Sequence, residues 1–378
     1  MPHRTAIVLG SGGAGAAYQA GVLKAVRELL PNTETTPFAI VCGASGGAIN
    51  AAALAASAVD FGAGVQRLEA LWSSLHAADV YCTGPVGAAL AGLRGLLAFA
   101  GSGRGGSSPG LLDNRPLRRL LESAIDFRRI EEAIAAHALH SLALTCSGYA
   151  SGQSVTFFQG RADLEPWKRP RRSGAHVKLT VDHVLASSAI PLVFPAVRLH
   201  REWFGDGAVR QSAPLSPAIR LGADRILVIG ADRIPTGDER PDGERPPGVA
   251  RVAGQALSAF YVDSMAADIE RLVRANRSLA MIPEMVRREH GLGQRHIDLL
   301  QLAPSQPLES LAAEHAGDLP WTVRALLRGM GAMEADGAAL ASCLLFESSY
   351  TRALIALGHA DTLARADEVR NFLNLTTH

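Results

Sequence analysis

Ser45 is the residue whose type and surroundings point most directly to chemistry. It lies in the sequence Gly-Ala-Ser-Gly-Gly at positions 43–47, between the apolar run 37–42 and an Ala-rich stretch. This pattern is typical of a nucleophile elbow, in which a strand ends sharply, a helix begins and the serine hydroxyl is exposed. Gly43 and Gly47 would let the neighbouring backbone pack closely. The helix N-terminus favours the negative charge that develops when the hydroxyl attacks a carbonyl. The pattern indicates acyl transfer or ester hydrolysis, and its alternative is a tight turn without chemistry.

A Gly-rich loop precedes this motif in the chain. The sequence Gly-Ser-Gly-Gly-Ala-Gly occupies positions 10–15, after the apolar run 6–9 and before a segment with helical periodicity. Glycines allow backbone N–H groups to converge on one point at a helix N-terminus, where the oxyanion of an acyl-transfer reaction can bind. The loop can therefore serve as an oxyanion hole.

The same loop also matches the dinucleotide-binding fingerprint Gly-x-Gly-x-x-Gly through Gly10, Gly12 and Gly15. That fingerprint needs an acidic residue at the end of the next strand to hold the ribose. The acidic candidates, Glu28 and Glu34, both precede that strand. A dinucleotide-binding enzyme is therefore the weaker alternative for this loop.

Asp206 begins a second polar turn, Asp206-Gly207-Ala208, directly after the residues Trp-Phe-Gly at 203–205. An aspartate in a Gly-flanked turn can be held near a serine and accept its proton. An aspartate that only caps the turn is the alternative. The combination of this turn with the Gly-rich loop and the serine motif favours the catalytic interpretation.

These three elements, in this order, resemble the motifs of the patatin-like phospholipases. The matching segments are the Gly-rich segment 9–23, the serine motif 43–47, the turn 206–208 and the flanking segments 186–191 and 213–218. The resemblance covers residue 5 to about residue 230. The tail is similar to extensions on bacterial members of the family.

The resemblance implies a Ser45–Asp206 dyad and not a Ser-His-Asp triad, and it implies that the backbone N–H groups of Gly12, Gly13 and Ala14 form the oxyanion hole. Asp206 would accept the Ser45 proton directly and return it to the leaving alcohol. His290 and His296 lie downstream, as a triad would require, but neither has a recognisable context. The implied activity is that of a serine esterase, a phospholipase A-type acyl hydrolase that releases fatty acids from lipid esters. It needs no metal and no cofactor.

One departure from the family pattern supports an alternative function. The family loop usually carries a lysine or arginine, and this chain has Gly15 at that position. The alternative is a lipid-binding or regulatory protein that keeps the patatin fold but has weak or no turnover.

Alternating strands and helices favour an α/β fold with a mainly parallel central sheet, and the resemblance implies a three-layer α/β/α arrangement. We expect a catalytic domain over 1–235 and a mostly helical C-terminal extension over 236–378, with a late strand near 296–302 that rejoins the sheet. The apolar, Gly-interrupted segment 72–112 is a candidate for a lid that opens on lipid, and ordinary packing is its alternative.

Composition narrows the classes of partner and compartment. Of the 378 residues, 48% are hydrophobic, and the formal net charge is +1, which argues against nucleic acid as a partner. The four cysteines lack disulfide or metal-binding spacing, as in a reducing compartment, and no apolar run is long enough to span a bilayer. We expect a cytoplasmic protein whose partner is a phospholipid or another acyl lipid. Its contact with the membrane would be peripheral and reversible.

Overall fold

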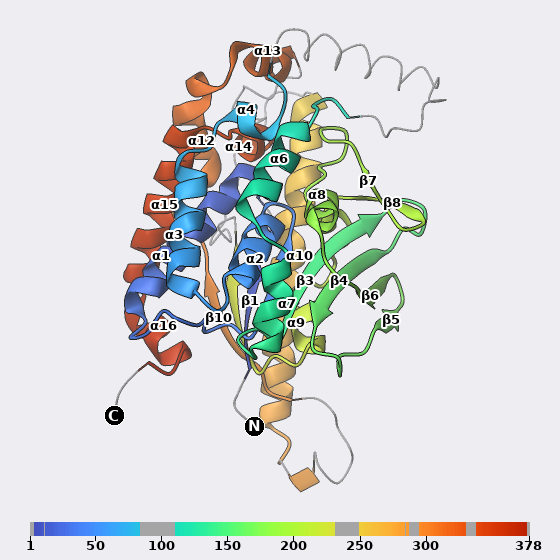
Figure 1. Cartoon of the computed structure of the whole chain (residues 1–378), viewed down its shortest axis with the longest axis vertical. Coiled ribbons are helices and arrows are strands. Elements are labelled where there is room, and N and C mark those ends of the chain that lie inside the picture. Colours follow the sequence, from blue (N-terminus) through green and yellow to red (C-terminus); the bar gives the residue numbers. More distant parts are fainter. Residues whose placement is uncertain are drawn as a thin grey trace.

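A computed structural model of the chain describes residues 4–10, 12–83, 110–230, 249–283, 285–286, 295–329 and 338–375. The described strands are β1 (Thr5–Leu9), β2 (Ile40–Ala44), β3 (Ser141–Gly148), β4 (Ser154–Gly160), β5 (Trp167–Arg169), β6 (Arg172–His176), β7 (Val197–Leu199), β8 (Glu202–Gly205), β9 (Arg225–Ile229) and β10 (Asp298–Leu302). They form one mixed sheet in the order β10-β9-β1-β2-β3-β4-β6-β5, with β8 paired to β3 and β7 paired to β8 (Figure 1).

The part of the sheet from β10 to β3 is entirely parallel. In its register Leu9 lies opposite Gly43, and Gly43 lies opposite Leu144. The carboxyl ends of these strands therefore meet at one edge of the sheet. The strands β4 and β8 both run antiparallel to β3, so β8 brings a later part of the chain to this edge.

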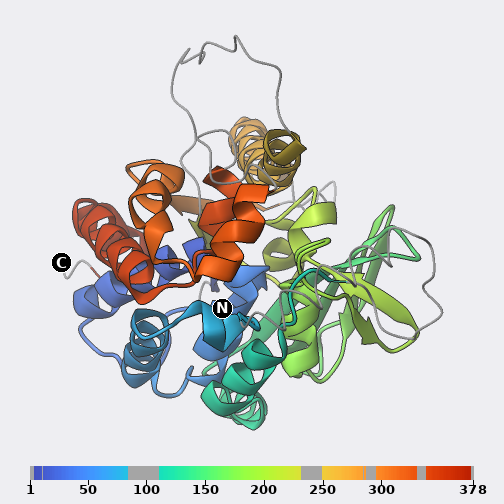
Figure 2. The same ribbon diagram turned by 90° about the horizontal axis from the view of Figure 1, so that it is seen from above.

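Helices cover both faces of the sheet, because strand side chains alternate between two apolar clusters. Ile7, Leu9 and Val41 belong to one cluster, whereas Ala6 and Val8 belong to the other. The first face is covered by helices that include α1 (Ala17–Leu29), α2 (Gly46–Ala56), α3 (Phe61–Ser73) and α15 (Ser348–Leu363). The second face carries α9 (Ser216–Arg220) and α10 (Val249–Ala280), and Figure 2 shows α3 and α10 on opposite sides. The three-layer α/β/α fold is confirmed.

Shorter helices complete these layers. They are α4 (Ala77–Val80), α6 (Arg115–Ala124), α7 (Arg128–Ala135), α8 (Val181–Ser187), α12 (Leu308–His315), α13 (Trp321–Gly329), α14 (Ala338–Leu344) and α16 (Ala366–Phe372). The 3-10 turns η1 (Gly13–Ala16), η2 (Gly207–Arg210) and η3 (Ala316–Asp318) lie between longer elements. Among the described helices, none combines the length and the apolar character needed to cross a bilayer.

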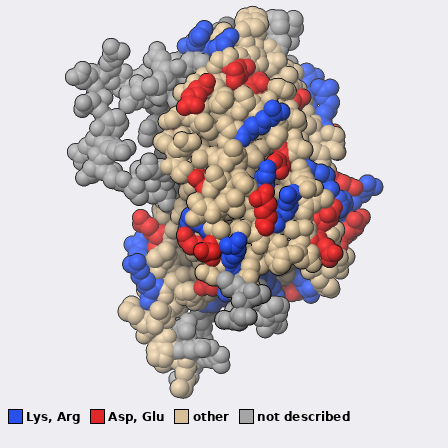
Figure 3. Space-filling model, turned by 90° about the vertical axis from the view of Figure 1, so that its left-hand side faces the viewer, with Lys and Arg blue, Asp and Glu red and all other residues tan. Residues whose placement is uncertain are grey.

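The C-terminal part of the chain packs against the N-terminal part. The strand β10 extends the sheet beyond β9, and α15 lies along α1 (Figure 2). The Tyr18 hydroxyl donates a hydrogen bond to Asp361 at 3.2 Å, and Glu28 pairs with His359 at 2.7 Å. On the surface formed by these helices, acidic and basic side chains are interspersed (Figure 3).

The lid candidate 72–112 is described only at its two ends. At the first end Trp72, Leu75 and Tyr81 are buried in the main apolar cluster, as ordinary packing predicts. Residues 84–109 lie outside the described residues, so the prediction of a lid stays a prediction. The expected domain boundary at residues 235–236 also lies outside the described residues.

Candidate active site

Ser45 forms the sharp turn between β2 and α2. Its φ of 55° and ψ of −131° are rare for a residue with a side chain, and such backbone strain gathers at functional sites. The Ser45 N–H donates to Ser187 Oγ at 3.1 Å, and that hydroxyl donates to the Thr145 carbonyl at 2.6 Å. The expectation of an exposed hydroxyl was wrong. Ser45 is 1% exposed, because the helices on this face cover the turn and leave it facing an internal pocket.

Glycines of the serine motif lie where the backbone leaves no room for a side chain. A Cβ atom on Gly47 would lie 2.4 Å from the carbonyl oxygens of Leu9 and Gly10, and one on Gly46 would lie 2.6 Å from that of Gly13. The start of α2 therefore packs directly on the Gly-rich loop. The other motif glycines make similar contacts, with Cβ positions 2.5 Å from Gly47 O for Gly43 and 2.0 Å from Thr145 O for Gly207.

Asp206 lies at the end of β8 and is completely buried. Its Oδ2 accepts a hydrogen bond from Ser45 Oγ at 2.6 Å. Its Oδ1 accepts one from the Ala208 N–H at 3.0 Å, and its own N–H donates to the Ala189 carbonyl at 2.9 Å. Asp206 therefore caps the turn with one carboxylate oxygen and holds the serine hydroxyl with the other.

The Ser45–Asp206 contact is direct, and no histidine described in the structure lies between the two residues. His296 pairs with Asp298 at the amino end of β10, which is the sheet edge opposite Ser45. His290 lies outside the described residues. His183 on α8 is buried, and this burial lowers its pKa to about 4, so its ring is neutral near pH 7.

A nearby thiol is not a competing nucleophile. Cys146 lies on β3 close to Asp206, and burial, reinforced by the Asp206 carboxylate, raises the pKa of this thiol well above its usual range. Because the thiolate is the reactive form, Cys146 stays inert at neutral pH. The described part of the chain holds no group of three or more His, Cys, Asp or Glu side chains arranged to bind a metal ion.

The Gly-rich loop leads from β1 into η1 beside the serine turn. Gly13 has a φ of 53°, and Gly15 donates its N–H to the Gly12 carbonyl at 2.8 Å. The N–H groups of Gly13 and Ala14 begin η1 and have no hydrogen-bond acceptor among the described residues. Of these two residues, Gly13 also lines the pocket next to Ser45.

An apolar pocket opens next to these polar groups. It is lined at one end by Gly13, Ser45 and Gly46, and the pocket with its mouth encloses about 520 Å³ of empty volume. The remaining lining residues are Ile49, Leu71, Trp72, Leu75, Val80, Leu117, Leu120, Leu121, Ser188, Ile190, Phe194 and Phe346. Nearly all of these are aliphatic or aromatic, so the pocket suits a hydrocarbon chain next to a polar reacting group.

The chain matches a known protein family over most of the described site. Residues 7–219 match the family model described as patatin-like phospholipase, and this match spans more than half of the chain. The chain belongs to the patatin-like phospholipase family. At the family level this membership supports a hydrolase that acts on acyl lipids.

No curated protein matches the chain. Among solved structures, the chain is similar to VipD from Legionella pneumophila, with 13% sequence identity and a TM-score of 0.40. This alignment covers 97% of the chain and 67% of VipD. Because the TM-score is low, the likeness carries no argument about the site.

Gly15, which stands where the patatin-like loop usually has a lysine or arginine, packs closely against the C-terminal part of the chain. Gly15 is buried, and a Cβ atom there would lie 3.3 Å from Cδ1 of Leu308 on α12. A lysine or arginine at this position would therefore meet the C-terminal part of the chain. The space next to the loop is apolar on this side.

Several residues of the site were missed by sequence reasoning. Phe346 follows α14 and lines the pocket from 301 positions beyond Ser45, and no local motif marks it. Asn50 is a buried polar residue in the otherwise apolar helix α2. A single asparagine among apolar residues is the signal in the sequence that could have indicated Asn50, because a buried amide needs hydrogen-bond partners.

Proposed function

We propose that the protein is a serine acyl hydrolase of phospholipase A type, which releases fatty acids from lipid esters with Ser45 as nucleophile and Asp206 as base. The observation that carries the proposal is the 2.6 Å hydrogen bond from Ser45 Oγ to Asp206 Oδ2 at the end of an apolar pocket. Covalent catalysis requires at least a nucleophile that is hydrogen-bonded to a group able to take its proton.

The reaction would follow two steps. In the first, Ser45 Oγ attacks the ester carbonyl, its proton passes to Asp206, and the oxyanion is bound by backbone N–H groups of Gly12, Gly13 and Ala14. Collapse of this intermediate expels the alcohol, which takes the proton from Asp206, and leaves an acyl group on Ser45. In the second, water gives a proton to Asp206 and attacks the acyl group. The bond between this group and Ser45 Oγ then breaks, Ser45 takes the proton back from Asp206, and the fatty acid is released.

The pocket supports an acyl lipid as the substrate. Each methylene group that leaves water for such an environment contributes about 0.8 kcal/mol, so binding should strengthen with chain length until the pocket is filled. The polar headgroup would stay outside, because few polar side chains line the pocket.

To reach a lipid substrate, the protein would be cytoplasmic and would contact a membrane peripherally and reversibly. Leu192 lies between the pocket residues Ile190 and Phe194, and 81% of its surface is exposed. Its φ of 68° is rare for a leucine. An exposed leucine next to an apolar pocket is suited to contact a lipid surface.

The dinucleotide alternative finds less support. A ribose-binding acid would lie at the end of β2, and this position carries Ala44 followed by Ser45. The start of α2 also packs on the loop at Gly10 and Gly13, where a pyrophosphate would approach. The loop geometry therefore favours an oxyanion over a nucleotide.

A fluorophosphonate probe combined with an ester substrate tests the proposal. The probe should label the wild-type protein and not Ser45→Ala, and only the wild type should hydrolyse a short-chain p-nitrophenyl ester. Ser123→Ala is a matched control, because this exposed serine on α6 bonds only its own helix at the Leu120 carbonyl. A folded wild type that takes up fatty acid but neither reacts with the probe nor turns over ester would instead support the lipid-binding alternative.

A further inference from the structure

Three buried side chains form a continuous hydrogen-bonded chain beside the Gly-rich loop. The Trp72 indole N–H donates to Asn50 Oδ1 at 2.8 Å. The Asn50 amide donates to Gln19 Oε1 and to the Ala16 carbonyl, both at 2.9 Å. The Gln19 amide donates to the Gly10 carbonyl at 2.7 Å. The chain thus joins three helices, α1, α2 and α3, to the loop.

The two main-chain acceptors lie at opposite ends of the loop. Gly10 follows β1, and Ala16 is the last residue of η1. Between them lie the N–H groups of Gly13 and Ala14, and Gly13 lines the pocket end that holds Ser45. Asn50 and Gln19 therefore hold the loop at both ends and leave its central amides free.

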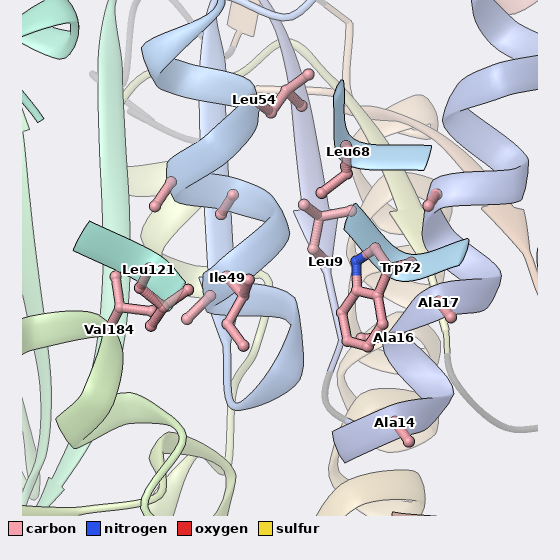
Figure 4. Packing of buried hydrophobic residues seen from close by; sticks show 14 of the residues in the cluster. Leu9, Ala14, Ala16, Ala17, Ile49, Leu54, Leu68, Trp72, Leu121 and Val184 are labelled. Atoms are coloured by element: carbon pink, nitrogen blue, oxygen red, sulfur yellow. The ribbon is translucent and has the colours of Figure 1, made fainter. Parts of the chain in front are cut away.

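The network is buried and highly satisfied. Asn50 and Gln19 are fully buried, and Trp72 is 1% exposed. Asn50 uses both of its N–H donors and its carbonyl oxygen in this network. In a dry interior a satisfied polar network specifies one arrangement, because any other arrangement leaves a buried group unpaired. In Figure 4 the Trp72 indole lies between α2 and the start of α1 near Ala16.

We propose that Asn50 is a positioning residue for the oxyanion-binding loop and acts together with Gln19. Asn50 holds the Ala16 carbonyl directly and the Gly10 carbonyl through Gln19, so that the central N–H groups stay aimed at the oxyanion bound next to Ser45. The inference rests on the proposed function, because it assigns a task to these amides in acyl transfer. Displacement of about 1 Å in such a site can change a rate by about a hundredfold.

The test compares the wild type with Asn50→Asp, which keeps the size of the side chain and the acceptor for Trp72. It removes the N–H donors to Ala16 and Gln19. We expect kcat on a soluble p-nitrophenyl ester to fall by about tenfold to a hundredfold, with KM nearly unchanged, because only interactions made in the transition state are lost. The inhibition constant of an alkyl trifluoromethyl ketone, which forms an oxyanion on the serine, should rise by the same factor as kcat/KM falls.

A second variant guards against a folding defect in the first. Gln19→Met removes the bond to Gly10 without adding a charge, and it should change kcat in the same direction. The matched control is Thr351→Val, which loses a different buried hydrogen bond, 2.6 Å long, to the main-chain carbonyl of Trp72. It should lower the melting temperature and leave kcat and the ketone inhibition unchanged.

The outcomes separate this inference from the proposed function. Folded Asn50→Asp and Gln19→Met proteins that keep the wild-type kcat would overturn the positioning role while ester hydrolysis stands. The same is true if only KM changes, or if Thr351→Val lowers kcat as much as they do. A wild type without Ser45-dependent turnover would overturn both the proposed function and this inference.

Discussion

The two ends of the pocket are built in different ways. The polar end consists of Ser45, Asp206 and the backbone at Gly13, which lie on turns next to strand ends and are fixed by short hydrogen bonds and main-chain contacts. The apolar wall consists mainly of aliphatic and aromatic side chains from several helices and from Phe346, which are held mostly by packing. The Trp72 indole is also held by its hydrogen bond to Asn50. A change at the polar end should therefore alter the rate of reaction, whereas a change in the wall should alter which acyl chain is accepted.

The largest effect on the rate is expected at Asp206, at the polar end of the pocket. Asp206→Asn should lower kcat by about a thousandfold, because the amide can still accept the Ala208 hydrogen bond but cannot take the serine proton. The rate on a soluble p-nitrophenyl ester measures this effect. His296→Ala is the control and should leave the rate nearly unchanged, since His296 lies at the other edge of the sheet. A histidine variant as inactive as Asp206→Asn would replace the dyad with a triad.

The next largest effect is expected at Gly13. A Cβ atom there would lie 2.3 Å from the Cys343 carbonyl oxygen, so Gly13→Ala must shift the loop or α14. We expect kcat to fall by about a hundredfold, as for the loss of one oxyanion donor.

Gly152→Ala is the matched control for Gly13→Ala. Gly152 has a similar φ, 64°, but nothing lies within 4 Å of its Cβ position. It should lose a comparable amount of stability from backbone strain and keep its activity. Equal losses of activity in the two variants would show that the effect at Gly13 is general destabilisation.

A moderate effect on selectivity is expected at the wall. Phe346 stacks on Trp72 with a 6.4 Å centroid distance, and Phe346→Leu should open space at this end of the pocket. The ratio of kcat/KM for a long-chain ester to that for a short-chain ester should rise by roughly tenfold or less. Phe38→Leu is the control, because Phe38 is buried against Phe61 and does not line the pocket. A large fall in kcat on both esters would place Phe346 with the polar end instead.

The smallest effect should come from Leu192. Leu192→Ser should lower turnover on phospholipid vesicles by roughly threefold relative to turnover on a soluble ester, because less apolar surface enters the lipid. Leu363→Ser is the control, as Leu363 is an exposed leucine at the end of α15. An unchanged ratio of the two rates would remove Leu192 from the membrane contact.

Much of the candidate site could be predicted because its parts are local. A serine at a strand-to-helix turn needs glycines around it, and the turn after β8 needs Gly207, so both leave a pattern within a few residues of sequence. The alternation of apolar residues in β1 likewise predicts a sheet covered on two faces. The burial of the Ser45 hydroxyl could not be predicted, because it depends on distant helices.

The sequence by itself determined the candidate groups of the site: the serine, the aspartate, the Gly-rich loop and the order in which they occur. The tertiary structure decided their distances. Ser45 and Asp206 are 161 positions apart, and they meet because β8 pairs with β3, which lies beside β2. The tertiary structure also decided that Phe346 lines the pocket and that Asn50 donates a hydrogen bond to the loop. Such contacts join side chains from separate elements, and only the packing of those elements brings them together.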